Sequence, residues 1–269
     1  MGIYHEQDGV TLYHGDNVQT MRESIPDASI DLVVTSPPYD NLRAYGGHTW
    51  DFEGLAAELW RVIKPGGVVV WVVADATVDG SETGTSFRQA LHFMELGFRL
   101  HDTMIYHRQG PYPETVRYSQ AWEFMFVLAK GQPETVNLIA DKINLYGGTK
   151  ATRPKLNRQR DGTLPEYNGP ERIRKEIGVR QNVWYIPAGG GISSSDAVAF
   201  NHPAIFPESL ARDHILSWSN EGDTVLDPFS GSGTTIKMAR LMGRKGIGIE
   251  IHQEYCDIAV ERLRQRLLF

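Results

Sequence analysis

Four residues, Ser36-Pro37-Pro38-Tyr39, follow the apolar run "SIDLVVT", which is typical of a buried strand. Two consecutive prolines cannot donate ladder hydrogen bonds, and Pro38 restricts the backbone of Pro37, so the strand ends in a stiff loop. The hydroxyl of Ser36 and the carbonyl of Pro37 can accept hydrogen bonds, and the ring of Tyr39 offers a face for stacking. A simple strand stop would use the same prolines, so this motif alone leaves both interpretations open.

A second group of residues lies near the other end of the chain, in "VLDPFSGSGTTIKMA". The pattern predicts a strand, a turn and the start of a helix. Gly231 and Gly233 would let the backbone approach a ligand closely, with helix N-terminal amides facing it. It is not a phosphate-binding Walker loop, because no lysine follows the second glycine. It is not the dinucleotide pattern either, because Ile236 stands where a third glycine or alanine is required.

An acidic residue, Glu250, follows this loop at a sequence separation typical of a residue that binds a ribose. Glu250 ends the next apolar run, 23 residues after Asp227. A carboxylate about 20 residues beyond a glycine loop suits a ribose, whose two hydroxyls can both donate to it. A tight turn followed by a solvated glutamate is the alternative, and the combination of Asp227, the two glycines and Glu250 favours a nucleoside-containing ligand.

These residues need elements that bring them together. Apolar runs predict strands at residues 9–16, 29–35, 68–73, 98–107, 122–131, 224–228 and 245–251. Helical spacing of apolar residues predicts helices at residues 52–64, 86–97, 207–219, 233–243 and 252–268. Apolar runs that alternate with helices indicate an α/β fold, with a mainly parallel sheet covered by helices on both faces.

The middle of the chain differs from its flanks, which gives three zones: residues 1–135, 136–200 and 201–269. The middle zone is rich in Gly, Pro and Asn and has little periodicity. Residues 142–180 contain ten basic and four acidic side chains, which gives this segment a net charge of +6. Because the whole chain has a net charge of −6, the residues outside this segment carry −12. Such asymmetry indicates a local surface for a polyanion, with a solvated basic face as the alternative.

Composition excludes several classes of protein. The chain has 269 residues with 41% hydrophobic and 22% charged, which is ordinary for a globular protein. It has no apolar run long enough for a membrane span and no basic-then-apolar start typical of a secretory signal. The single cysteine, Cys256, excludes an internal disulfide, and no Cys/His spacing resembles a zinc site. We therefore expect a cytoplasmic protein without a metal.

Taken together, "DPFSGSGTT" and "TSPPY" closely resemble the amino-group DNA methyltransferases, which act on cytosine N4 or adenine N6. The resemblance covers nearly the whole chain, including "LWRVIKPGG", "WEFMFVLAKG", "NHPAIFPESLARDHI" and "GIGIEI". The motif order resembles the beta arrangement of that family. It implies a circularly permuted, Rossmann-like methyltransferase sheet, in which the chain starts at the third strand and supplies the first two at its end. The middle zone would then be a small inserted DNA-recognition region.

The resemblance implies methyl transfer from S-adenosylmethionine to an exocyclic amine, leaving S-adenosylhomocysteine. Such an amine is a poor nucleophile because its lone pair is delocalised into the ring, so polarisation and alignment are needed. Ser36 and the Pro37 carbonyl would accept hydrogen bonds from the amine and stabilise the positive charge that develops on it. Pro38 would stiffen the loop, and Tyr39 would stack on a base flipped out of the duplex.

The resemblance also assigns binding residues. On the methionine side and in the loop it places Asp227, Phe229, Gly231, Gly233 and Thr234. Glu250 would hold the ribose with Ile251 against adenine, Asp16 would contact the adenine amine, and Phe206 would pack near the methionine end. The histidines, His202 among them, are expected to be structural. Double-stranded DNA would be contacted by basic residues of the middle zone, namely Arg153, Lys155, Arg158, Arg160, Arg172, Arg174 and Lys175.

Several alternatives remain at this level. Family members that act on cytosine N4 more often carry Ser at the first motif position, so Ser36 favours cytosine over adenine N6. Methylation of cytosine carbon 5 needs a thiolate, and Cys256 lies on the last predicted helix, where core packing is expected. An inactive DNA-binding module and a small-molecule or RNA methyltransferase are the other interpretations. The intact motifs argue against the first, and the basic segment argues against the second. A homodimer and a restriction-modification or orphan role in a bacterial or phage-infected cell are further expectations from the family.

Overall fold

The computed structural model describes residues 2–39, 50–108, 116–150, 158–164, 172–189 and 191–264. Two compact units are formed. The larger unit comprises Met1–Asn137 and Asn182–Phe269, and the smaller unit comprises Leu138–Gln181. The predicted middle zone, 136–200, is thus divided, because the short strand β11 (Val183–Tyr185) pairs with a strand of the larger unit and draws the following residues into it.

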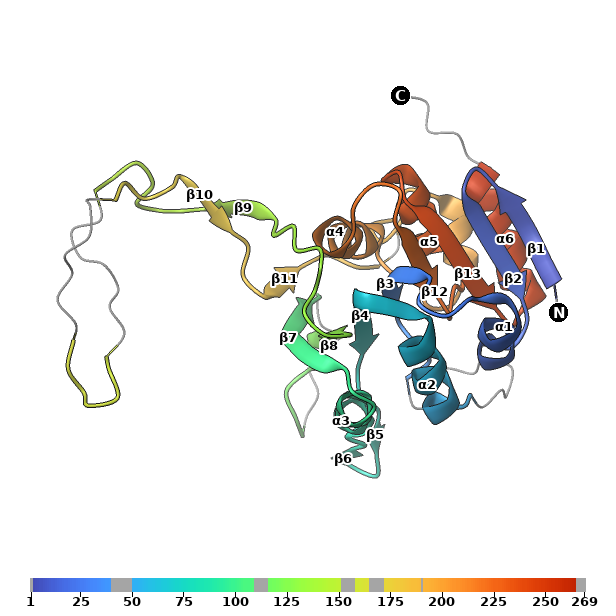
Figure 1. The fold of residues 1–269 in the computed structure, drawn as a ribbon, viewed down its shortest axis with the longest axis horizontal. Helices are drawn as coiled ribbons and strands as arrows, with labels where there is room; N and C mark the ends of the chain where they lie inside the picture. The colour runs from blue at the N-terminus through green and yellow to red at the C-terminus, as the bar shows by residue number, and fades with distance from the viewer. Residues whose placement is uncertain are drawn as a thin grey trace. The chain divides into compact units, whose positions relative to one another are not determined.

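The larger unit is built on a nine-stranded sheet (Figure 1). Its spatial order is β1 (Gly2–Gln7), β2 (Val10–His14), β13 (Lys245–Glu250), β12 (Thr224–Asp227), β3 (Ile30–Thr35), β4 (Ile63–Val73), β8 (Trp122–Ala129), β7 (Arg99–His107) and β11. The central run from β2 to β4 is parallel, whereas β1 and β8 run antiparallel to their neighbours. The prediction of a mainly parallel sheet is confirmed.

The order of the strands confirms the circular permutation. The last two strands of the chain, β12 and β13, lie in the middle of the sheet between β2 and β3, which come from its beginning. All four run parallel to one another, so their carboxyl ends meet at one edge. The residues at or just beyond those ends include Asp16, Ser36, Asp227 and Glu250. Ligands of open α/β sheets bind at such an edge.

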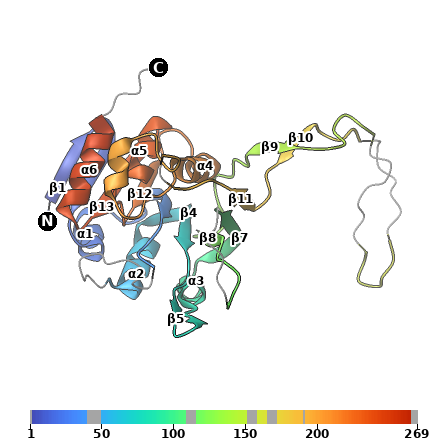
Figure 2. The same ribbon diagram turned by 180° about the vertical axis from the view of Figure 1, so that it is seen from behind.

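Helices cover both faces of the sheet (Figures 1 and 2). One layer consists of α1 (Asn17–Ser24), α2 (Phe52–Val62) and α3 (Thr85–Glu95), which contact one another in that order. The other consists of α4 (Glu208–Trp218), α5 (Thr234–Leu241) and α6 (Gln253–Arg264), preceded by a 3₁₀ turn at Ala197–Asn201. The five predicted helices are present, whereas α1 and β1 were not predicted.

Local signals explain why these helices form where they do. Asp51 caps α2, because its carboxylate accepts a hydrogen bond from the Gly54 amide at 2.9 Å. The apolar side of α2, including Leu55 and Leu59, is completely buried. It packs against the sheet in a core that also contains Trp71 of β4. Each fully buried large side chain of this kind contributes about 1.5–3 kcal/mol to folding, so the core holds the strand ends rigidly.

The smaller unit contains an antiparallel pair, β9 (Ala140–Ile143) and β10 (Ile177–Val179). Arg180 forms a two-nitrogen contact with the Asp141 carboxylate across this pair. Farther along, Arg174 donates to Thr149 Oγ1 at 3.0 Å and to the Lys150 carbonyl at 3.2 Å. These contacts tie the two strands of the unit together over a segment that was predicted as extended or loop structure.

A further hairpin, β5 (Thr77–Val78) with β6 (Ser81–Glu82), precedes α3. None of the helices in the described ranges combines the length and the apolar character that crossing a membrane requires.

Candidate active site

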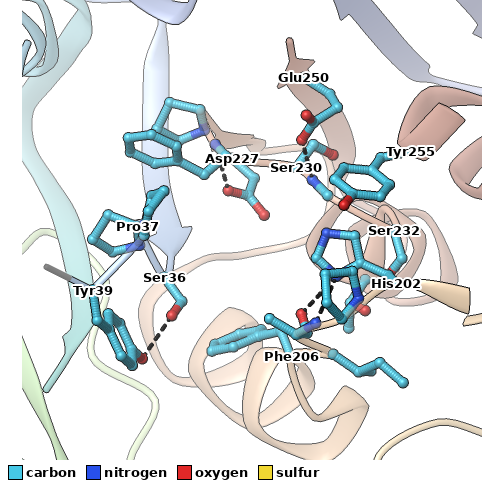
Figure 3. Close-up of a pocket in the computed structure, with 18 of the residues that line it drawn as sticks. Ser36, Pro37, Tyr39, His202, Phe206, Asp227, Ser230, Ser232, Glu250 and Tyr255 are labelled. Carbon is cyan, nitrogen blue, oxygen red and sulfur yellow. Dashed lines mark hydrogen bonds between the residues drawn. The ribbon is translucent and has the colours of Figure 1, made fainter. Parts of the chain in front are cut away.

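A cavity of about 680 Å³ opens at the carboxyl ends of β3, β12 and β13 (Figure 3). It is lined by all four residues of the predicted catalytic motif, Ser36, Pro37, Pro38 and Tyr39. It is also lined by eight of the nine predicted cofactor residues, namely Asp16, Phe206, Asp227, Phe229, Gly231, Thr234, Glu250 and Ile251. Ser36 and Tyr39 lie on one side of the view, Glu250 and Tyr255 lie on the other, and Asp227 lies between them (Figure 3).

The motif after β3 carries a connected set of hydrogen bonds. Ser36 Oγ lies 2.8 Å from the phenol oxygen of Tyr39, and Tyr39 donates to Glu123 Oε2 at 2.9 Å. Arg108 Nε lies 3.1 Å from the other carboxylate oxygen of Glu123, close enough for an ion pair although its N–H is not aligned for a hydrogen bond. Glu123 comes from β8 and is 84 residues from Tyr39 in the chain, so no local pattern links it to the motif.

Asp227 is a carboxylate buried at the end of β12, with 5% of its surface exposed. Its Oδ1 accepts hydrogen bonds from Thr35 Oγ1 at 2.7 Å and from the Phe229 amide at 3.1 Å. Burial nevertheless dominates and raises the pKa of Asp227 to about 6. A group of this kind is ready to be stabilised by a cationic ligand.

The Glu250 carboxylate holds the glycine loop. Its Oε2 accepts from the Gly231 amide at 2.8 Å, and its Oε1 accepts from the His252 amide at 2.9 Å. Burial raises the pKa of Glu250. Each carboxylate oxygen has a second lone pair, so the group can still accept two further hydrogen bonds from a ligand.

The two glycines of the loop are required for different reasons. Gly231 has a positive φ of 49°, and a side chain there would come within 3.0 Å of the His202 ring beside the cavity. Gly233 does not line the cavity. It has a φ of 77° at the cap of α5, and an added Cβ would lie 2.7 Å from Cβ of Ala259 on α6. Gly233 therefore allows α5 and α6 to pack closely, whereas Gly231 faces the ligand space.

The remaining predicted residues lie where a ligand could reach them. Asp16 caps α1 by accepting from the Gln19 amide at 2.9 Å, and it also borders the cavity. Phe229 packs edge-on against Trp50, with ring centroids 5.0 Å apart. The hydroxyl of Thr234 accepts a hydrogen bond from Arg262 Nη1 at 2.9 Å, which fixes the position of its oxygen.

A buried ionic cluster supports the loop and was missed from the sequence. Arg262 is fully buried on α6 and donates to the carbonyl of Ser232 at 2.7 Å. Its guanidinium also contacts Asp196 at 3.0 Å and Glu208 at 2.7 Å, and Lys237 of α5 contacts the same two carboxylates. Despite burial, hydrogen bonds from Lys237 and its neighbours lower the pKa of Glu208 to about 2. No local signal joins residues so far apart in the chain.

Other cavity residues were also missed. His202, expected to be structural, lies on the cavity wall and packs edge-on against Tyr255, with ring centroids 4.3 Å apart. Ser230 lies beside them, and its buried hydroxyl has no hydrogen-bond partner among the described residues. The one available clue was "NHPAIF", a short polar-apolar stretch before a helix. Cys256 is buried in the core, as predicted.

The predicted DNA contacts belong to the smaller unit. Arg158, Arg160, Arg172 and Lys175 are exposed there, whereas Arg174 is half-buried and bonded within the unit. Arg153 and Lys155 lie outside the described residues. Nowhere in the described ranges do three or more His, Cys, Asp or Glu side chains come together as a metal site would require.

Comparison of the sequence gives clear relatives. The family model described as DNA methylase (N6_N4_Mtase) matches residues 30–261. The chain is 57% identical over 250 residues to the orphan methyltransferase M.BamHII of Bacillus amyloliquefaciens, and the match covers 92% of this chain and 94% of that protein. It is 28% identical to the type II methyltransferase M.Cfr9I of Citrobacter freundii, over 96% and 89% of the two chains.

Solved structures with the same fold include TTHA0409 of Thermus thermophilus in complex with S-adenosyl-L-methionine. It is 26% identical, with a TM-score of 0.62, and the match covers 94% of this chain and 92% of that one. PvuII DNA methyltransferase, described as cytosine-N4-specific, has a TM-score of 0.68 at 20% identity, over 100% and 92% of the chains. At that identity the second likeness concerns the fold alone.

Proposed function

We infer the reaction from the family to which the chain belongs. It is a member of the DNA methylase family that acts on exocyclic amines. It is therefore an S-adenosylmethionine-dependent enzyme. We propose that its target is the N4 amine of a cytosine flipped out of duplex DNA. S-adenosylmethionine supplies an electrophilic methyl group on a positively charged sulfur. The residues of this chain would bind that cofactor on one side of the cavity and activate the amine on the other.

The cavity suits such a cofactor. Two buried carboxylates with raised pKa values, Asp227 and Glu250, border it. We assign the ribose hydroxyls to the remaining lone pairs of Glu250, and the cationic methionine end to Asp227. Ile251, 39% exposed, offers an apolar surface for the adenine ring, and Asp16 at the same edge can accept from its amine.

The opposite side of the cavity suits the amine. Ser36 Oγ and the Pro37 carbonyl follow β3 on a stiff loop, so two acceptors are held in fixed positions before the base arrives. Accepting from both N–H bonds would direct the nitrogen lone pair toward the methyl group. The same contacts would strengthen as positive charge develops on the nitrogen.

The preference for cytosine is carried by one observation, the hydroxyl of Ser36 at the first position of the motif. The hydroxyl of Ser36 is a neutral group that can both accept and donate a hydrogen bond. Adenine-specific relatives often carry an acidic or amide side chain at this position, and such a side chain is larger than serine or carries a negative charge. Adenine N6 is the second candidate. Both amines can donate to a hydroxyl, so the support comes from the family pattern together with the placement of Ser36 on the cavity wall.

The experiment is to methylate unmodified duplex DNA with the purified enzyme, digest it to nucleosides and identify the products by mass. N4-methylcytosine is the expected product. N6-methyladenine without N4-methylcytosine would show that the target is adenine.

A further inference from the structure

The phenol of Tyr39 links the methyl-acceptor side of the cavity to a carboxylate. Its oxygen lies 2.8 Å from Ser36 Oγ and 2.9 Å from Glu123 Oε2, and Figure 3 shows the first of these contacts. Tyr39 and Glu123 are 84 residues apart in the chain. Stacking on a base requires only the ring of Tyr39, so the hydroxyl contacts need a separate explanation.

The direction of the hydrogens follows from the chemistry of the three groups. An ionised carboxylate can only accept, so the single phenol hydrogen points to Glu123. The contact between Tyr39 and Ser36 must then use the hydrogen of Ser36, which donates to the phenol oxygen. Both lone pairs of Ser36 Oγ are left available to accept from an amine. With the phenol turned the other way, Ser36 would use one lone pair for Tyr39 and would point its own hydrogen elsewhere.

We propose that Glu123 is a positioning residue that acts through Tyr39 to fix Ser36 as a hydrogen-bond acceptor for the target amine. This inference rests on the proposed function of the motif as an amine-binding site. It holds for either target base, because cytosine N4 and adenine N6 both present N–H donors.

Glu123 is itself held firmly. It lies on β8, directly opposite Tyr106 of β7 in the antiparallel register, and its side chain is 14% exposed. The Arg108 amide donates to the Ala121 carbonyl at 2.9 Å, which extends the pairing beyond the strands and places the guanidinium beside the carboxylate. A charge partner of this kind favours the ionised form of Glu123, the form that the hydrogen-bond direction requires.

The test uses Glu123→Gln, which keeps the shape of the side chain. Its amide can donate to the phenol oxygen, which allows the phenol hydrogen to turn toward Ser36. The single-turnover rate of methyl transfer is expected to fall about tenfold, as for the loss of one hydrogen bond in the transition state. The cofactor Kd and the DNA KM should stay within about twofold of the parent values, because the contact strengthens only as charge develops.

A double-mutant cycle with Tyr39→Phe separates this role from a structural one. Tyr39→Phe keeps the ring and removes the link, so it should itself lower the rate by a similar factor. Glu123→Gln should then have no further effect in the Tyr39→Phe background. An equal loss in both backgrounds, or an unchanged rate for Glu123→Gln, would overturn the proposal.

A matched control comes from another phenol–carboxylate pair. Tyr4 donates to Asp257 Oδ1 at 2.5 Å on the surface of the molecule, and neither residue lines the cavity. Tyr4→Phe and Asp257→Asn should leave the rate unchanged. The product nucleoside of the parent enzyme tests the target base, whereas the ratio of rates in the cycle tests Glu123, so either can fail without the other.

Discussion

At the scale of single residues, the cavity joins two kinds of oxygen that are held differently. The hydroxyl of Ser36 is oriented by a neighbouring phenol, 2.8 Å away, on a loop made stiff by two prolines. The carboxylate of Asp227 is held by a hydroxyl and a backbone amide in a nearly closed environment. The first suits a group that must accept from an amine as charge develops, and the second suits a ligand that arrives already charged.

Ser36→Ala should lower turnover by about 10- to 1000-fold, the range seen when one preorganised hydrogen-bonding group is removed from a reacting centre. The cofactor Kd should not change, because Ser36 and Glu250 lie on opposite sides of the cavity view (Figure 3). Single-turnover transfer of labelled methyl and calorimetry with S-adenosylmethionine measure the two quantities. Ser81→Ala, at the exposed hairpin β5–β6, is the control. An unchanged rate in Ser36→Ala would exclude the hydroxyl from the reaction.

Asp227→Asn should stabilise the cofactor-free protein while weakening cofactor binding. The pKa of Asp227 is raised from 3.8 to about 6 in the folded state. Between those two pH values the folded chain holds a proton that the unfolded chain has lost, so the stability of the folded state falls as the pH rises through this window. The cost above pH 6 is about 3 kcal/mol at most, and asparagine removes it while keeping an acceptor for Thr35.

The measurements for Asp227→Asn are urea unfolding and cofactor calorimetry between about pH 5 and pH 7, below the ordinary pKa of an α-amino group. The parent protein should lose cofactor affinity as the pH falls through about 6, because the carboxylate becomes neutral. The variant should bind weakly with little dependence on pH. The same pH dependence in both proteins would show that another group controls binding.

At the scale of elements, the turn between β12 and α5 is held from several sides. Glu250 at the end of β13 accepts from Gly231, and Arg262 of α6 donates to the Ser232 carbonyl. Position 233 must also be a glycine, because α6 leaves no room for a side chain there. The position of the loop is thus set jointly by a neighbouring strand and a neighbouring helix.

Gly233→Ala should destabilise the protein more than the left-handed backbone alone requires. Gly222→Ala is the matched control, because its φ of 87° resembles the 77° of Gly233 while an added Cβ would meet nothing within 4 Å. The control should cost about 1–2 kcal/mol for the backbone conformation. Gly233→Ala should cost about 1–3 kcal/mol more, because its Cβ would overlap Ala259. Urea unfolding compares the two, and equal losses would show that α6 moves aside easily.

At the scale of the whole molecule, charge is divided between segments. Residues 142–180 carry +6 within a chain of net charge −6. Not every cation there is available to a partner, since Arg174 and Arg180 are bonded within the smaller unit. Among the predicted DNA contacts that the structure describes, Arg158, Arg160, Arg172 and Lys175 are exposed. We propose these four as phosphate contacts, in keeping with the DNA-recognition role predicted for this region from the sequence.

Replacing the four exposed cations by glutamine should weaken DNA binding and flatten its dependence on salt. Each lost phosphate contact should reduce the slope of log K against log salt concentration by about 0.9. The cofactor Kd should not change. Binding titrations at several salt concentrations measure the slope, and an unchanged slope would mean that these side chains form only a solvated surface.

A paired control is available in the larger unit. Arg99 and Lys245 begin β7 and β13, at the edge of the sheet opposite the cavity, and both are exposed. Arg99→Gln with Lys245→Gln changes the net charge as much as Arg172→Gln with Lys175→Gln. Only the replacement of Arg172 and Lys175 should alter the slope of log K against log salt concentration.

Elements and residues whose signals are local could be predicted from the amino-acid sequence. The apolar runs of β3 and β4, the glycine turn after β12 and the prolines after β3 were all readable, because strand burial and turn geometry depend on neighbouring residues. Eight of the nine predicted cofactor residues line the cavity. Parallel strands end at one edge, so residues that follow their ends meet there.

Contacts between side chains that are distant in the chain could not be predicted, because they depend on how the elements pack. Helix α1 has a mostly polar sequence, and it forms where Asp16 caps it and α2 covers its buried side. Glu123 reaches Tyr39 because β8 pairs with β4, which lies beside β3. Arg262 reaches Ser232 because α6 packs on α5. Such contacts depend on strand order, register and helix packing, which are properties of the whole chain, and no local pattern of residues encodes them singly.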